Sequence, residues 1–306
     1  MQILRCPAQL QLLEETLRKS LPTTLPVLGT VMTVARGNPA SHEVLVDSWP
    51  NFSIVLTRLR PEVLDPKDYY TNQLSVFYRD KGALQALLEG TEAVTRERAF
   101  QILGKYGTGR TLGSSVEMIQ YRALMRVPNP TPEWYKGPIF HPWVAQGFPI
   151  PPHLPSQLEP AFSIPPSAMP CCRMPPGLRL APVSPSHISL LNATWALGGN
   201  ARSRAFLLGL VRALPSACLL GPRGRPVSWS LLDGQGCLRH GYTVPAWRGR
   251  GLTGLPLNAL GRELHARGFP IYCAVLPHNT ASLHALQAIG FEPQPGTFHM
   301  ILGTPK

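Results

Sequence analysis

The chain has 306 residues, and the 44% that are hydrophobic suffice for one large or two ordinary packed cores. Its net charge of +12 is concentrated in residues 183–306, whose eleven Lys and Arg against three Asp and Glu would attract nucleic acid, an anionic membrane or a phosphorylated cofactor. No apolar run reaches the roughly eighteen residues of a transmembrane helix, and the six cysteines form no CxxC pair, which disfavours a zinc module and a disulfide framework.

The first 126 residues predict a mixed α/β domain. Leucines at helical spacing predict an amphipathic helix over residues 8–20, and the early Glu14 and Glu15 are atypical of a transit peptide, so we expect an intracellular protein. A helix closed by Gly90 is expected over residues 82–90. Short runs rich in β-branched residues predict strands at 26–34, 43–49, 52–59 and 73–80. No catalytic constellation stands out in this part.

Residues 127–182 are dense in proline. Proline has no amide donor and pushes the preceding residue out of the helical region, so regular ladders are not expected. The segment predicts an extended, partly disordered linker. A ligand for a proline-recognition domain is an alternative, although no basic residue cleanly flanks a PxxP core.

Residues 183–306 return to regular patterning. Two helices are expected over 187–195 and 203–215, followed by a helix over 257–268, a strand over 269–277, a helix from Asn279 and a last strand near 298–303. Between the two pairs of helices, glycine turns separate three short strands at 216–221, 226–232 and 237–244. This part therefore predicts an antiparallel meander flanked by helices.

The loop Arg248–Gly251, RGRG, lies between the last meander strand and the next helix. Glycines let a backbone approach a phosphate closely, loop amides and a helix N-terminus supply donors, and two arginines add fixed charge. The sequence therefore predicts a pyrophosphate site here, against the plainer alternative of a βα connection with exposed arginines.

The order of elements and two signatures resemble the GNAT acyltransferase superfamily. The RGRG loop is similar to the acyl-CoA signature of an Arg or Gln with Gly three residues later, although Thr253 stands where that signature has Gly or Ala. Asn279, followed by Gly290 and Phe291, is similar to the second signature of an Asn, a helix and a closing Gly-Phe.

Further segments resemble the glycine N-acyltransferase-like family. They are TWALGGN, PSACLL, GRPVSW, GYTVPAWR and RGFPIY, with SLP, VLGTVM, RGNP and VDSWPNF nearer the N-terminus. The resemblance covers residues 1 to about 105 and 177–306. It implies a mixed α/β architecture with domain 1–126 as a degenerate GNAT-like half, a linker over 127–182 and a GNAT domain over 183–306.

By this resemblance, the protein transfers an acyl group from acyl-CoA to the amino group of glycine or a similar small amino acid, by direct attack of the amine on the thioester. The last meander strand would splay from the next strand to admit the pantetheine arm. No metal is implied, and we expect a monomer located in mitochondria like the conjugating enzymes of the family, with the cytoplasm as the alternative location. The cofactor contacts implied are Val244, Arg248, Gly249, Arg250, Gly251, Thr253 and Asn279.

The catalytic base departs from the family pattern. Cys237 occupies the place of the family glutamate, and Leu286 the place where many GNAT enzymes have a tyrosine as general acid. The candidates for catalysis are therefore Cys237, whose alternative is a packed thiol, and His240, which reaches the substrate only if a bulge or the splay turns it there. Asp233 is interpreted as turn chemistry, and Pro256 as a residue that delays or bends its helix.

Two other functions remain open on the sequence. A non-catalytic acyl-CoA-binding regulatory protein would explain Cys237 and Leu286. A nucleic-acid binder would explain the isoelectric point of about 9.8, but we find no interleaved aromatics, recognition helix or lysine clusters, and we expect no nucleic-acid partner.

Overall fold

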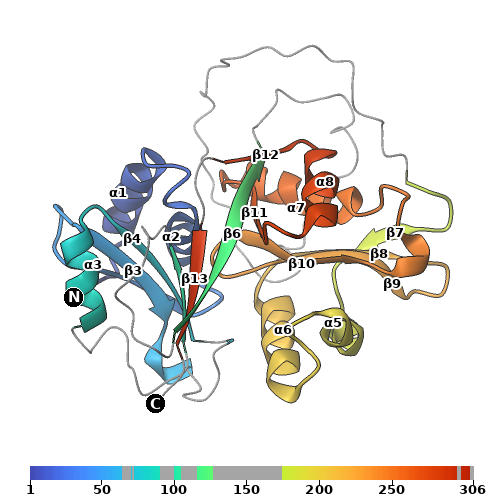
Figure 1. Cartoon of the computed structure of the whole chain (residues 1–306), viewed down its shortest axis with the longest axis horizontal. Coiled ribbons are helices and arrows are strands. Elements are labelled where there is room, and N and C mark those ends of the chain that lie inside the picture. The colour runs from blue at the N-terminus through green and yellow to red at the C-terminus, as the bar shows by residue number, and fades with distance from the viewer. Residues whose placement is uncertain are drawn as a thin grey trace, which may run out of the picture.

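The computed structural model of the chain describes residues 1–63, 70, 72–89, 100–104, 116–126, 174–294 and 298–303. These residues form two halves joined through one sheet, with the first half on the left and the second on the right in Figure 1. The predicted helix end at Gly90 and the proline-rich residues 127–173 lie outside the described residues.

Each half follows one order: an edge strand, two helices, a three-stranded meander, a helix, and a strand parallel to the last meander strand. In the first half these are β1 (Gln2–Leu4), α1 (Pro7–Arg18), α2 (Leu25–Ala35), β2 (His42–Val46), β3 (Ile54–Leu59), β4 (Gln73–Tyr78), α3 (Lys81–Glu89) and β5 (Phe100–Gly104). In the second half they are β7 (Arg179–Ala181), α5 (Ile188–Thr194), α6 (Ala201–Ala213), β8 (Ser216–Leu220), β9 (Pro226–Leu232), β10 (Cys237–Thr243), α7 (Gly254–Ala266) and β11 (Tyr272–Val275), followed by α8 (Thr280–Gln287) and β12 (Phe291–Pro293). The repeated order confirms a GNAT-like first half joined to a GNAT second half.

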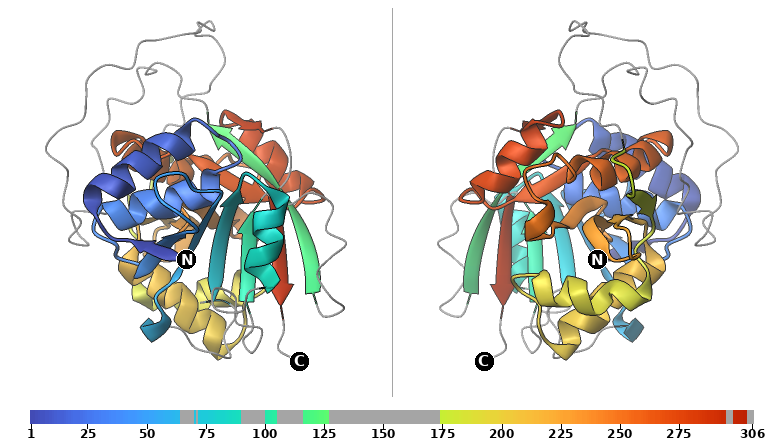
Figure 2. Two further views of the ribbon diagram at one scale, coloured as in Figure 1. Left: turned by 90° about the vertical axis from the view of Figure 1, so that its left-hand side faces the viewer. Right: turned by 90° about the vertical axis from the view of Figure 1, so that its right-hand side faces the viewer.

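Two strands are exchanged between the halves. β6 (Val116–Arg126) pairs with β13 (Phe298–Gly303) along 116–121 and with β11 along 122–125. β13, from the end of the second half, lies between β5 and β6. Both views of Figure 2 show β13 in red beside β6 in green, within the sheet of the first half. Each half of the sheet therefore includes a strand that pairs with the other half of the chain.

Helices cover both faces of the sheet. In the first half, Val44 and Val55 face the core under α1 and α2, whereas Leu45 and Leu56 face the cluster under α3, as strand alternation requires. In the second half, α5 and α6 cover one face of β8–β10 and α7 and α8 the other, as Figure 1 shows. Both faces of the meander are therefore buried, and β10 pairs with β11 over only two residues.

Two of the predicted elements were wrong. Residues 26–34 were expected to form a strand but belong to α2, which is buried on every side between the halves, so its apolar run has no polar face to reveal a helical period. The predicted linker over 127–182 overlaps β7 (Arg179–Ala181), which pairs with β8 at the edge of the sheet, so its predicted C-terminal end is several residues too late. Pro256 does not delay the start of α7, because it lies in the first turn, where an amide has no intrahelical partner.

The β9–β10 turn docks the second half onto the first. A Cβ on Gly29 of α2 would lie 1.8 Å from the carbonyl oxygen of Gln235, and a Cβ on Gly236 would lie 3.0 Å from the Gly29 Cα. Gln235 Nε2 donates to Ser75 Oγ of β4 at 2.8 Å. Glycine at position 29 is therefore required for the turn to reach the first half.

Candidate functional site

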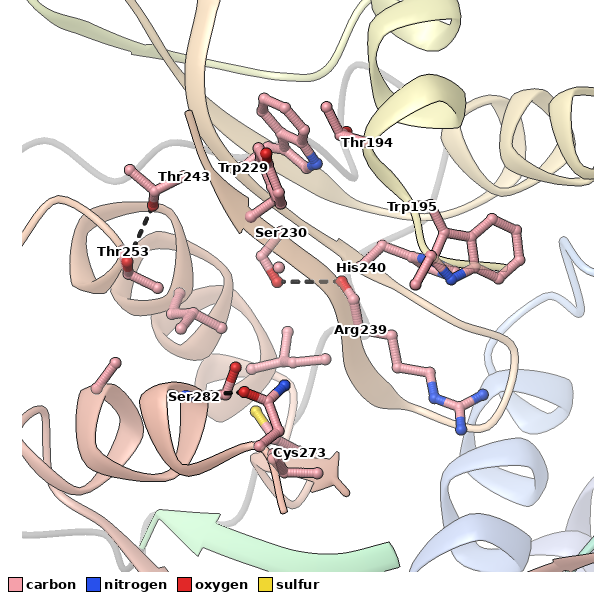
Figure 3. Close-up of a pocket in the computed structure, with 18 of the residues that line it drawn as sticks. Thr194, Trp195, Trp229, Ser230, Arg239, His240, Thr243, Thr253, Cys273 and Ser282 are labelled. Atoms are coloured by element: carbon pink, nitrogen blue, oxygen red, sulfur yellow. Dashed lines mark hydrogen bonds between the residues drawn. The ribbon is translucent and has the colours of Figure 1, made fainter. Parts of the chain in front are cut away.

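A cavity of about 820 Å³ lies between β10 and β11. Its lining in the described residues comes from the α5–α6 loop, β10, the loop before α7, β11 and α8, and from Tyr70, Gln73 and Gln101 of the first half. Figure 3 looks into it, with the Thr243–Thr253 contact at one end and Arg239 toward the other. The cavity therefore runs from the predicted pyrophosphate loop to the boundary between the halves.

The two parallel strands separate after a short contact. β10 and β11 are in register only at Cys237 with Tyr272 and Leu238 with Cys273. Beyond this point, residues 239–243 of β10 and 274–275 of β11 line opposite walls of the cavity. The expected splay is present, and the space between the two strands belongs to the cavity.

A β-bulge turns His240 into the cavity. Between the pairs Arg239–Leu231 and Tyr242–Trp229, β10 has one residue more than β9, and His240 takes a φ of 55°. Its ring lies perpendicular to Trp195 at 4.7 Å between centroids and close to Phe206, as Figure 3 shows for the Trp195 contact. The sequence analysis required a bulge or the splay for His240 to reach a substrate, and the structure has a bulge at this residue.

The His240 imidazole is neutral at physiological pH. Burial among the aromatic rings and, to a smaller extent, the charge of Arg239 lower its pKa to about 3. We find no hydrogen-bond partner for its ring nitrogens among the described residues. A ligand in the cavity would therefore meet a neutral imidazole, whose unprotonated ring nitrogen can accept a hydrogen bond.

The loop before α7 presents a run of backbone amides. The amides of residues 249–253 have no protein acceptor within the described part of the chain, and α7 begins directly after them. Gly249 and Gly251 have φ values of 73° and 69°, and a Cβ on either would point into open space. Successive unpaired amides at a helix N-terminus form a cradle for an anion.

The two arginines of this loop are held in place. Arg248 Nε donates to the Thr243 carbonyl at 2.9 Å, and its guanidinium lies over the Tyr242 ring. Arg250 lies over Trp247. Arg248 lines the cavity, so its charge acts beside the cradle. The Val244 amide, in contrast, donates to the Val227 carbonyl within the sheet, so only its other groups are open to a ligand.

Thr253 ties the cradle to the sheet. Its hydroxyl lies 2.9 Å from that of Thr243, which lies 2.9 Å from the hydroxyl of Ser228, and the first of these bonds is drawn in Figure 3. The departure at this position from the acyl-CoA signature therefore adds a hydroxyl chain from β9 to the loop. Asn279 caps α8 by accepting from the Ser282 amide at 3.2 Å and also lines the cavity.

Cys237 lies on the other face of β10. It is fully buried against Leu25, Tyr272 and Met300, and the described lining of the cavity does not include it. Burial and the nearby Asp233 raise the pKa of its thiol well above the usual range. The geometry favours the packing interpretation of Cys237, and Leu286 likewise contributes only an apolar wall.

The turn at Asp233 is structural, as expected. Its Oδ1 accepts from the amides of Gln235 and Cys237, both at 2.9 Å, and its Oδ2 lies 3.5 Å from Arg239.

Three aromatic residues, Trp195, Phe206 and Tyr70, pack together and form an aromatic wall of the cavity, which the sequence analysis did not predict. The Tyr70 hydroxyl donates to the Leu197 carbonyl. The segment TWALGGN was the only signal for it.

Comparisons with known proteins agree with this geometry. The family model described as aralkyl acyl-CoA:amino acid N-acyltransferase matches residues 1–127, and the model of its C-terminal region matches residues 217–305. Glycine N-phenylacetyltransferase from Bos taurus is 33% identical over 281 residues, covering 88% of each chain. Glycine N-acyltransferase from Bos taurus is 32% identical over 317 residues, covering 97% of each.

The chain belongs to the aralkyl acyl-CoA:amino acid N-acyltransferase family. A Drosophila protein of known crystal structure has the same fold, with a TM-score of 0.63 and 16% identity over 99% of this chain and 98% of its own. The cradle is formed by loop residues that the resemblance implies for acyl-CoA, and the splay lies between the two strands for which the resemblance implied it. None of the described helices is long and apolar enough to cross a bilayer, and no cluster of three metal-ligating side chains occurs among the described residues.

Proposed function

We propose that the protein transfers an acyl group from acyl-CoA to the amino group of glycine or a similar small amino acid. The observation that carries this proposal is a single cavity that joins an anion cradle, a strand splay and a neutral histidine at a bulge. The cradle amides and Arg248 would hold the pyrophosphate, and the splay the pantetheine arm. The thioester would then lie near the end of the splay, beside His240.

The reaction needs no acyl-enzyme. The free amine attacks the thioester carbonyl, the C–N bond forms and the C–S bond breaks, and the proton lost by nitrogen balances the proton gained by the CoA thiolate. His240 would take the proton from the attacking nitrogen, which becomes far more acidic as the C–N bond forms. Holding amine and thioester together contributes as much as or more than the base, so the reaction does not depend on a glutamate.

The first experiment is thiol release from benzoyl-, acetyl- and a long-chain acyl-CoA, with and without a panel of amino acids. We expect release that depends on the amino acid and a product of matching mass. Binding of acyl-CoA without release for any acceptor would overturn the proposal and leave a regulatory acyl-CoA-binding protein. DNA binding that acyl-CoA fails to compete would instead indicate a nucleic-acid partner.

We also propose that the protein is monomeric and mitochondrial. The exchange of β6 and β13 within one chain supports a monomer, because neither sheet needs a strand from a second copy. The mitochondrial location rests on the resemblance to conjugating enzymes. Light scattering after gel filtration and fractionation against a matrix marker test the two statements; a dimer or a cytosolic distribution would contradict them.

A further inference from the structure

The end of the cavity opposite the cradle is built by the first half. Gln73 of β4 and Gln101 of β5 both line it. They are direct partners in the parallel register of these strands, so their side chains lie side by side on one face of the sheet. This face therefore presents two carboxamides toward the second half.

The carboxamide of Gln101 is available to a ligand in the cavity. Its side chain is only 7% exposed, and the structure gives its carboxamide no hydrogen-bond partner among the described residues. Its carboxamide atoms are not among the fully buried atoms that lack a partner, so the small exposed part of the side chain faces the cavity, where a bound polar group can reach it. The next inward-facing residue of β4, Ser75, is in contrast already occupied by Gln235.

Arg239 brings a positive charge to the same end. Its side chain lines the cavity, is 15% exposed and is held by Asp233, whose turn also carries the Gln235 contact to Ser75. Figure 3 shows it extending from β10 away from the Thr243–Thr253 contact. A guanidinium next to amide donors is the arrangement that recognises a carboxylate.

We propose that Arg239, Gln73 and Gln101 bind the carboxylate of the acceptor amino acid. This inference rests on the proposed function and extends it to the acceptor. An α-amino acid carries its amine on the carbon next to the carboxylate, and His240 follows Arg239 directly on β10, so binding here presents the amine toward the imidazole. The first half, which has no CoA signature, then acts in choosing the acceptor.

The test compares the best amino acid of the acceptor panel with its carboxamide, which keeps the amine but removes the carboxylate charge. In Gln101→Met and Arg239→Lys we expect kcat/KM for the amino acid to fall about 10- to 100-fold, the size of a lost charge-assisted hydrogen bond. The carboxamide should change little, and the KM for acyl-CoA should stay the same. Gln2→Met, at an exposed position of β1, is the matched control.

Arg239→Lys keeps a cation beside Asp233, and Gln101→Met keeps the side-chain volume, so both variants should fold; bound acyl-CoA verifies this. Equal losses for the amino acid and its carboxamide, or no loss, would overturn the inference while leaving the proposed function intact. If the wild type releases no thiol, equilibrium dialysis of labelled glycine against the CoA-loaded protein still decides: binding weakened by Gln101→Met supports the subsite, and unchanged or absent binding overturns it.

Discussion

We propose that His240 serves as the proton acceptor in place of the glutamate that the family resemblance implies at position 237. Cys237 begins β10 with its side chain in the core, whereas the bulge three residues later rotates His240 toward the cavity. On this proposal, the proton acceptor lies three residues further along β10 than the family glutamate. Contact with Trp195 and burial keep its imidazole neutral.

The His240→Gln variant tests this role. Glutamine keeps polarity but accepts no proton from an amine, so we expect kcat to fall by about 10²-fold or more, the lower range for a general base. The affinity for CoA should not change. His265→Gln, exposed near the end of α7, is the control. A kcat within a factor of about three of the wild type would show that another group takes the proton.

The pH dependence of the rate should come from the acceptor amine, because the pKa of His240 is lowered to about 3. The imidazole is already deprotonated from mildly acidic to alkaline pH, so it adds no inflection there. The fraction of acceptor in the free-amine form rises with pH, and kcat/KM should rise with it. Steady-state rates between about pH 6 and 9 measure this; a flat profile would contradict it.

The free energy of unfolding should also rise with pH. His42 is buried against Gly234, and burial lowers its pKa from 6.5 to about 4. Below pH 6.5 the unfolded chain binds a proton that the folded chain does not, so the free energy of unfolding falls as the pH drops. The loss from His42 is on the order of 2 kcal/mol by about pH 5.

Urea unfolding at neutral pH and at about pH 5 measures this effect. The difference between wild type and His42→Leu isolates the histidine from other titrating groups, including the buried Asp233, whose raised pKa acts in the opposite direction. An identical pH dependence in both proteins would show that His42 is protonated without cost in the folded state.

At the scale of elements, the strand–loop–helix unit of β10, residues 248–253 and α7 forms the anion cradle. Arg248 is fixed at its edge by Thr243 and Tyr242, so its charge is preorganised. We expect Arg248→Glu to raise the KM for acyl-CoA about tenfold or more while changing kcat less. Arg212→Glu, exposed on α6, makes the same change of net charge; an equal effect of both variants would refute a local role.

This unit was predictable from sequence because its chemistry is local. Glycines, arginines and the helix start all fall within residues 248–266, and Asn279 signals the cap of α8 in the same way. α2 was not predictable, since its apolar run reflects burial from both halves rather than a strand. The bulge at His240 depends on pairing with β9, and the Gln73–Gln101 pair on the β4–β5 register, neither of which leaves a local pattern.

At the scale of the molecule, the exchanged strands make the two halves one cooperative unit. Met300 of β13 is 5% exposed and packs with Leu103 of the first half and Cys237 of the second. We expect Met300→Asp to destabilise the fold by more than about 3 kcal/mol, since it buries an unpaired charge. Hydrogen exchange should rise in β5 and β11 together.

The control for this experiment is Leu12→Asp, which places the same charge on α1 where Leu12 is 49% exposed. Loss of protection confined to one half in Met300→Asp would show that the halves unfold independently. The exchange of β6 and β13 could not be inferred from the sequence, because each strand reads as belonging to the half in which it is encoded.

The position of β13 also means that the first half of the sheet cannot be completed until the end of translation. The ribosome completes β5 and β6 long before residues 298–303 emerge, and at about 5–20 residues per second this interval is on the order of ten seconds. Throughout it, the facing edges of β5 and β6 lack the strand that separates them in the finished sheet. The nascent first half therefore keeps two strand edges without their final partner until residues 298–303 emerge, which exposes it to incorrect strand pairing.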